Sequence, residues 1–212
     1  MNNLFTELEN KNKQIPLADL LRPKTLEDFL GQENVISKNS PLFNLLKSGR
    51  LFSLILWGPS GCGKTTLARI IANSVNAQFI EISAVTSGVK DIKDAVERAK
   101  EALRNGQKTI LFIDEIHRYS KTQQDALLPH LENGTLFLIG STTENPSFQV
   151  VPALLSRVQV IRLENLSDEV ISRVVKNGFS YLAKNNQPID YNDDVVEFIA
   201  NLARGDARYA LN

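Results

Sequence analysis

One short segment constrains the fold of this 212-residue chain more than any other. Residues 58–65 read Gly-Pro-Ser-Gly-Cys-Gly-Lys-Thr, which fits the pattern G-x-x-x-x-G-K-[ST]. An apolar run, Leu54–Trp57, precedes this segment, and a helical pattern, Lys64–Asn73, follows it. The glycines let the backbone curl so that successive N–H groups point at one phosphate, and the helix N-terminus adds partial positive charge. The segment therefore predicts a strand–loop–helix unit that binds a phosphate chain.

The rest of the chain repeats this alternation of strand and helix patterns. Helical patterns cover Lys64–Asn73, Val89–Asn105 and Thr122–Glu132. Between most of them lie short apolar runs, several of them apolar almost throughout, as strands covered on both faces must be. The runs are Ser53–Trp57, Gln78–Ile82, Lys108–Ile113, Leu136–Gly140 and Val158–Leu163. The alternation predicts an α/β fold, with a parallel five-stranded sheet flanked by helices.

Composition and cap signals divide the chain into three parts. Residues 1–15 are polar and are predicted to be a disordered tail, and residues 16–164 are predicted to form the α/β domain. Within that domain, Ser40 and Pro41 open a short helix that ends at Gly49. The strands cease after Leu163, and residues 165–212 are predicted to form a helical lid that is incomplete at its C-terminal end. Two of its helices begin at the cap residues Ser167 and Asn192, and a third begins near Asp206.

A second motif, Ile110–Glu115, is an apolar strand that ends in two acidic residues. Asp114 is predicted to hold Mg²⁺ together with the Thr65 hydroxyl, and Lys64 to contact the β- and γ-phosphates. Glu115 is predicted to orient and deprotonate the attacking water. The alternative is a strand-to-helix cap, for which Asp is also a good choice. The predicted phosphate-binding residues are Gly58, Pro59, Ser60, Gly61, Cys62, Gly63, Lys64, Thr65 and Thr66.

Composition excludes several other functional classes. The formal net charge is zero, so no global positive field recruits nucleic acid. The single cysteine, Cys62, excludes an intramolecular disulfide, and no Cys/His cluster has metal-site spacing. Cys62 is either a thiol with a pKa lowered by the helix N-terminus or a small residue at a variable position. Because no apolar run suits a signal peptide or a membrane span, we expect a cytoplasmic protein.

Four further segments resemble motifs of AAA+ P-loop NTPases. Residues 20–32 resemble the adenine-binding box of clamp loaders, and residues 139–143 resemble the sensor 1 strand of the Holliday-junction motor RuvB. Residues 154–157 resemble an arginine-finger motif, and residues 205–212 resemble a sensor 2 helix. Three longer strings resemble the replication-associated recombination protein A family, called RarA or MgsA in bacteria, with the Werner helicase-interacting protein as eukaryotic counterpart. These strings are residues 83–90, residues 114–118 with 123–125, and residues 141–148.

The resemblance implies roles that the residues alone do not show. Thr143 would be sensor 1, contacting the γ-phosphate or the water, with Thr142 and Asn145 as alternatives. Arg157 would reach into the ATP site of the next subunit; the alternative is a surface arginine after a short helix. Ser83 lies where many AAA+ proteins keep a polar residue that holds the catalytic glutamate inactive. The adenine pocket and sensor 2 would be formed by Pro23, Leu30, Gly31 and Arg208.

The same resemblance implies DNA as a partner and ATP and Mg²⁺ as ligands. It implies DNA-stimulated ATP hydrolysis in an intact homo-oligomer, a tetramer, acting at stalled forks, strand ends or single-strand gaps without reading sequence. It also implies nucleoid association and replication proteins such as single-strand-binding protein as partners. Two other functions stay open: an ATP-switched recruitment module, and a clamp-loader or RuvB-like motor subunit. Candidate phosphate contacts are Lys90, Lys93, Arg118 and Lys121, although interleaved acidic residues also suit a solvated helix face.

Overall fold

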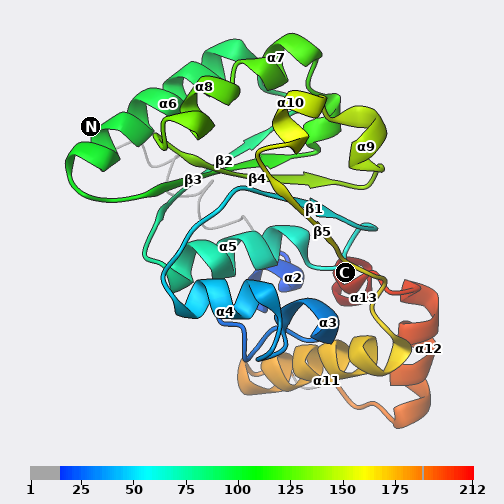
Figure 1. The fold of residues 1–212 in the computed structure, drawn as a ribbon. Helices are drawn as coiled ribbons and strands as arrows, with labels where there is room; N and C mark the ends of the chain where they lie inside the picture. Colours follow the sequence, from blue (N-terminus) through cyan, green and yellow to red (C-terminus); the bar gives the residue numbers. More distant parts are fainter. Residues whose placement is uncertain (1–14, 188) are drawn as a thin grey trace, which may run out of the picture.

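The computed structural model describes residues 15–187 and 189–212, so the predicted tail lies outside the described residues except for Ile15. Five parallel strands form one sheet in the order β2-β3-β4-β1-β5 (Figure 1). Every predicted apolar run overlaps one strand, which confirms the predicted sheet. The strands are β1 Leu54–Trp57, β2 Gln78–Ser83, β3 Thr109–Asp114, β4 Phe137–Thr142 and β5 Gln159–Arg162.

The central strands β1, β3 and β4 are buried on both faces, as their apolar character requires, whereas the edge strand β5 is largely exposed. In β1, Leu54 and Leu56 pack with α5 (Lys64–Ser74), whereas Ile55 between them packs with α6 (Val89–Arg104) on the opposite face. The same alternation is seen in β3, where Phe112 packs on the face covered by α5, and Leu111 and Ile113 pack on the face covered by α6. Both faces of the sheet therefore contribute to the core, and the strand ends are the edges left for ligands.

Figure 1 shows the helices of the sheet in two layers, with α5 and α4 on one face and α6 to α10 on the other. The predicted single helix Thr122–Glu132 is wrong, because the structure has two helices there, α7 (Lys121–Asp125) and α8 (Leu128–Glu132). Pro129 explains the break: it has no N–H to donate, and its ring would clash with the carbonyl of Asp125 in a continuous helix. The remaining short elements are η1 Ile116–Arg118, α9 Pro146–Gln149 and α10 Pro152–Leu155.

Within the described residues, three short helices precede the sheet, namely α2 (Leu17–Leu20), α3 (Glu33–Ile36) and α4 (Pro41–Lys47). As predicted, Ser40 caps α4, accepting the N–H of Phe43 at 3.1 Å. The buried Gln32 side chain joins this region to the segment after β5. Its Nε2 donates to the carbonyl of Glu164 at 2.7 Å, and its Oε1 accepts the N–H of the same residue at 3.0 Å. Gln32 thus fixes the N-terminal helices at the junction between sheet and lid.

The lid consists of α11 (Asp168–Lys184), α12 (Asp193–Ala203) and α13 (Ala207–Leu211). It has its own small core of Leu166, Ile171, Val175, Val196, Ala200 and Ala203. The predicted helix starts are confirmed, because Ser167, Asn192 and Asp206 each accept the N–H three residues further on. None of the helices in the described part of the chain is long and apolar enough to span a membrane.

Candidate active site

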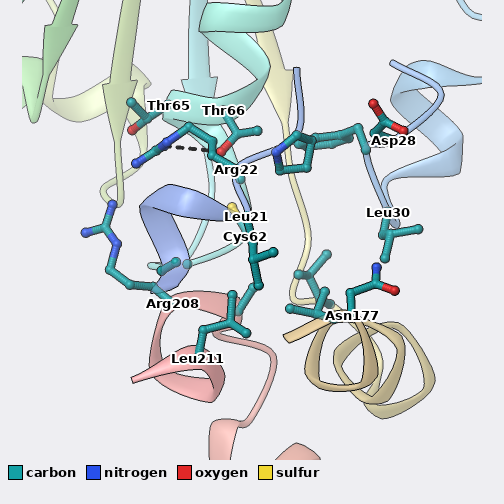
Figure 2. Close-up of a pocket in the computed structure, with 18 of the residues that line it drawn as sticks. Leu21, Arg22, Asp28, Leu30, Cys62, Thr65, Thr66, Asn177, Arg208 and Leu211 are labelled. Carbon is teal, nitrogen blue, oxygen red and sulfur yellow. Dashed lines mark hydrogen bonds between the residues drawn. The ribbon is translucent and has the colours of Figure 1, made fainter. Parts of the chain in front are cut away.

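The carboxyl ends of β1, β3 and β4 meet at one edge of the sheet, where ligands bind in open α/β folds. Strand β4 lies between β1 and β3, with Thr142 paired to Trp57 and Gly140 paired to Ile113. These strand ends open onto a cavity of about 770 Å³, shown in Figure 2. From this edge the cavity is lined by Ser60, Gly61, Cys62, Gly63, Lys64, Thr65, Thr66, Asp114, Glu115 and Thr143.

The phosphate loop, residues 58–65, leads directly into α5. Gly63 precedes the helix at φ +102°, and a Cβ there would lie 2.7 Å from the Phe29 ring. No side chain of the described residues caps this end of the helix. The first N–H groups of the helix lack intrahelical partners, and α5 is 11 residues long. These groups and the helix dipole form an anion site at the cavity wall.

Lys64 is buried, and its ammonium group folds back over the phosphate loop. Its Nζ donates to the carbonyl of Gly58 at 2.9 Å and to that of Pro59 at 2.7 Å. Gly58 and Pro59 are not among the described residues that line the cavity, and their carbonyls hold the Lys64 ammonium group. An ammonium group has three donors, and one remains for a ligand in the cavity.

The acidic pair at the end of β3 is fixed by β4. Ser141 donates its hydroxyl to Asp114 Oδ1 at 2.5 Å and accepts the backbone N–H of Glu115 at 3.3 Å. Glu115 has a left-handed backbone, φ +54°, which costs about 1–2 kcal/mol for a residue with a side chain. Its carboxylate lies 3.3 Å from His117 Nδ1. By contrast, the Ser83 hydroxyl accepts the N–H of Val85, so this contact is local and does not involve Glu115.

The three alternatives for sensor 1 have different surroundings. Thr143 lines the cavity. Thr142 is fully buried, and its hydroxyl donates to the Glu144 carbonyl and accepts the Glu144 N–H, at 3.2 and 3.0 Å. The Asn145 side chain caps α9 by accepting the N–H of Ser147. Position therefore favours Thr143, whose role stays a prediction.

Residues of the predicted adenine box form a second wall of the cavity. Pro23 and Leu30 line it, whereas Gly31 is not among the described lining residues. A Cβ at Gly31, φ +76°, would lie 2.8 Å from Leu166 Cδ2, so this glycine allows close packing against the lid. Figure 2 shows Arg22 reaching Thr66, to which Nη1 donates at 3.3 Å.

The lid supplies a third wall. Arg208, predicted from the sequence, lines the cavity together with Leu211 of the same helix, α13 (Figure 2). One face of α11 also lines the cavity, and its residues follow helical spacing, although no motif in the sequence predicts this face: Val174, Asn177, Tyr181 and Lys184. Spacing alone marks a helical face, but it does not show what that face covers.

The start of α13 rests directly on the phosphate loop. Ser60 donates its hydroxyl to Asp206 Oδ2 at 2.9 Å, and the N–H of Ala207 donates to the Gly61 carbonyl at 3.3 Å. Gly61 has φ +64°, and a Cβ there would lie 2.0 Å from Asp206 Oδ1. The lid therefore contacts the phosphate loop at Gly61, where the loop has no side chain.

Two groups of predicted residues lie away from this cavity. Arg157 donates from Nε to Glu132 Oε1 at 2.8 Å and from Nη1 to the Ala153 carbonyl at 2.7 Å, and it is not among the described lining residues. The four candidate DNA contacts are exposed on α6, η1 and α7: Lys90, Lys93, Arg118 and Lys121. The structure does not bring either group to the phosphate loop of the same chain.

Cys62 is 1% exposed, and burial raises the pKa of its thiol. This direction opposes the hypothesis of a pKa lowered by the helix N-terminus and favours the alternative of a small residue at a variable position. Lys64 lowers the pKa, but less than burial raises it. Cys62 therefore acts in the loop as a small buried side chain and through its backbone, and not as a reactive thiol.

The residues present suit a magnesium ion carried by a nucleotide. In the described part of the chain no group of three or more His, Cys, Asp or Glu residues could hold a metal by itself. Magnesium is usually bound by one or two protein oxygens together with substrate phosphates and water. Asp114 and Thr65 line the same cavity as the uncapped start of α5, and they are the residues that would supply those oxygens.

Comparison with known proteins identifies the family. Residues 54–166 match the "ATPase family associated with various cellular activities (AAA)". The chain belongs to the AAA family. It is 47% identical to Replication-associated recombination protein A of Escherichia coli K12, over 100% of this chain and 48% of that protein. It is also 45% identical to ATPase WRNIP1 of Dictyostelium discoideum, over 100% of this chain and 24% of that protein. These matches confirm the resemblance to the RarA and Werner helicase-interacting proteins.

Solved structures of AAA proteins confirm the fold. The Thermotoga maritima RuvB Holliday junction branch migration motor matches with a TM-score of 0.73 and 31% identity, covering 90% of this chain and 63% of that one. The chain spans about half the length of the curated bacterial relatives it matches. The α/β AAA+ fold, with a five-stranded parallel sheet followed by helices, is thus established for the described residues.

Proposed function

We propose that this chain is the nucleotide-binding domain of a Mg²⁺-dependent ATPase that acts on DNA at stalled or damaged replication forks. One observation carries the proposal: residues 60–65 of the phosphate loop, Asp114, Glu115 and Thr143 all line one cavity. The relatives' names, which refer to replication-associated recombination, support the biological setting. Membership of the AAA family supports ATP as the nucleotide.

The residues of the cavity divide the work of hydrolysis. Lys64 and the first N–H groups of α5 bind the phosphates. Asp114 and Thr65 would hold Mg²⁺, which when bound neutralises charge on the phosphates. Ser141 keeps the Asp114 carboxylate in place. Glu115 orients a water molecule and takes its proton, and Thr143 contacts the γ-phosphate or that water.

The proposal also assigns roles to the residues around the adenine and to the lid. Pro23 and Leu30 contact the adenine opposite the cavity-lining face of α11. Arg208 reports the nucleotide state, since α13 contacts the phosphate loop through Asp206 and Ala207. A change at the phosphates would then move the lid.

Arg157 requires a neighbouring subunit, because it is not among the described residues that line its own cavity. We therefore propose a homo-oligomer, a tetramer in the intact protein, in which Arg157 stabilises charge at the next ATP site. DNA stimulation, nucleoid association in the cytoplasm and contacts with replication proteins such as single-strand-binding protein complete the proposal. Lys90, Lys93, Arg118 and Lys121 are its DNA-contacting residues.

The test compares Glu115→Gln with Glu101→Gln, an exposed control on α6, in the intact assembled protein. We expect Glu115→Gln to lower ATP turnover by about 10²–10⁴-fold, the usual contribution of a general base, while ATP binding persists. Glu101→Gln should match the wild type. Unchanged turnover in Glu115→Gln would defeat the mechanism, whereas equal partner binding by ATP-locked Glu115→Gln and by the cycling wild type would favour the ATP-switched recruitment module.

A further inference from the structure

The His117 side chain is buried beside the acidic pair, and although His117 belongs to the family string at residues 114–118, neither the sequence analysis nor the proposed mechanism gives it a role. Its side chain is 4% exposed, and it lies in η1, two residues after Glu115. Each ring nitrogen faces a carboxylate: Nδ1 lies 3.3 Å from Glu115 Oε2, and Nε2 lies 3.3 Å from Glu144 Oε1. Nδ1 also lies 2.9 Å from Thr142 Oγ1.

The surroundings of Nδ1 favour a proton on that atom. Thr142 Oγ1, 2.9 Å from Nδ1, is also paired with the carbonyl and the N–H of Glu144. Glu115 Oε2 lies 3.3 Å from the same nitrogen, and a carboxylate can only accept a hydrogen bond. With Nδ1 protonated, one N–H serves both the end of β4 and the proposed general base.

Glu115 needs such a partner. Its side chain is 30% exposed, whereas the Ser141 bond described above holds only its backbone N–H. Ser83, the residue that the family resemblance suggested as its partner, makes local contacts instead. A general base must lie within hydrogen-bond reach of the water it deprotonates, so a freely rotating carboxylate would be inefficient.

We propose that His117 is a positioning residue for Glu115, whose carboxylate it holds through Nδ1–H. The proposal rests on the proposed function, in which Glu115 acts on water. The ring also ties Glu115 to the turn after β4, because Thr142 and Glu144 flank Thr143 at the cavity wall. The position of the general base is thereby linked to the residue proposed to contact the γ-phosphate.

Two substitutions distinguish the roles of the two ring nitrogens. The amide nitrogen of Asn takes the place of Nδ1, so His117→Asn retains the donor toward Glu115 and Thr142. The amide nitrogen of Gln takes the place of Nε2, so His117→Gln retains only the contact toward Glu144. In the intact assembled protein we expect His117→Gln to lower kcat for ATP by about 100-fold, as a misplaced catalytic group does, with KM unchanged. His117→Asn should stay close to wild-type kcat.

A histidine with a merely structural role would give a different pattern. Both variants would then lower the melting temperature and kcat together, and the order of Asn and Gln would not matter. Equal kcat in the two variants, or kcat unchanged by His117→Gln, would overturn the proposal. Failure of His117→Asn to fold would overturn it too, because the proposal assigns the essential bonds to Nδ1–H.

A double substitution shows whether His117 acts through Glu115. In a Glu115→Gln protein we expect His117→Gln to cause no further loss in single-turnover hydrolysis, since the group it positions is already gone. Additive losses would contradict the proposal. If Glu115→Gln retains full turnover, the proposed function fails. If Glu115→Gln loses turnover while His117→Gln does not, the positioning role alone fails.

Discussion

Three consecutive hydroxyl side chains at the end of β4 have three separate tasks. Ser141 contacts Asp114 and the backbone of Glu115, Thr142 contacts His117, and Thr143 lines the cavity. The sequence motif predicted a functional hydroxyl here and named Thr143 first. It could not separate Thr142 from Thr143, because both are threonines at the point where the strand turns. Their hydrogen bonds, which depend on η1 and the following turn, make the distinction.

At the same scale, we expect the thiol of Cys62 to be unreactive in the folded protein. Because burial raises its pKa above the ordinary 9.0, its thiolate fraction at pH 8 is smaller than that of a free cysteine. Alkylation of Cys62 by iodoacetamide should be slow at pH 8. Its rate should keep rising with pH beyond the pH at which the rate for a free thiol levels off. The denatured protein is the control and should react as a free thiol. Equal rates for folded and denatured protein would contradict the expectation.

At the scale of elements, local signals predicted most of the sheet and its caps. Apolar runs marked the five strands, and Ser40, Ser167 and Asn192 marked helix starts that the structure confirms. The single helix predicted over Thr122–Glu132 is wrong because Pro129 interrupts the helical hydrogen bonds although the apolar spacing continues past it. The cavity-lining face of α11 was missed for another reason. Its role depends on how the lid folds back on the sheet, which no local signal specifies.

The contact between α13 and the phosphate loop predicts an unequal response to alanine at two glycines. Gly61 and Gly134 both have positive φ, +64° and +70°, so alanine costs about 1–2 kcal/mol of backbone strain at either position. A Cβ at Gly61 would also lie 2.0 Å from Asp206 Oδ1, whereas one at Gly134 meets no atom of the described residues within 4 Å. In urea unfolding, Gly61→Ala should therefore lose more stability than Gly134→Ala. Equal losses would show that the lid does not press on the loop.

At the scale of the whole molecule, the cavity is assembled from parts that are distant in sequence. The box before β1, the three strand ends and the lid each form one wall. Sequence motifs placed the phosphate loop, Asp114 and Glu115 together because parallel strands bring their carboxyl ends to one edge. The motifs also predicted a role for Arg157, but they did not predict which groups surround its side chain. Its guanidinium is bonded to Glu132 and Ala153, and it is not among the described residues that line its own cavity, so the proposal has it act on the cavity of another copy.

That geometry predicts complementation between two inactive variants. Lys64→Ala subunits lose the phosphate-binding ammonium but keep Arg157, and Arg157→Ala subunits keep an intact cavity but lack the arginine. Each variant alone should have little ATPase activity, since such an arginine contributes about 10³–10⁵-fold. In an equimolar mixture assembled head to tail, about one quarter of the cavities pair an intact site with an intact arginine, so activity should reappear. The control is a mixture of Lys64→Ala with Glu115→Gln. Every cavity in it lacks either Lys64 or Glu115, so no arginine from a neighbour can restore activity, and the mixture should stay inactive. Activity in the first mixture no higher than the mean of its two components would place Arg157 outside the reaction.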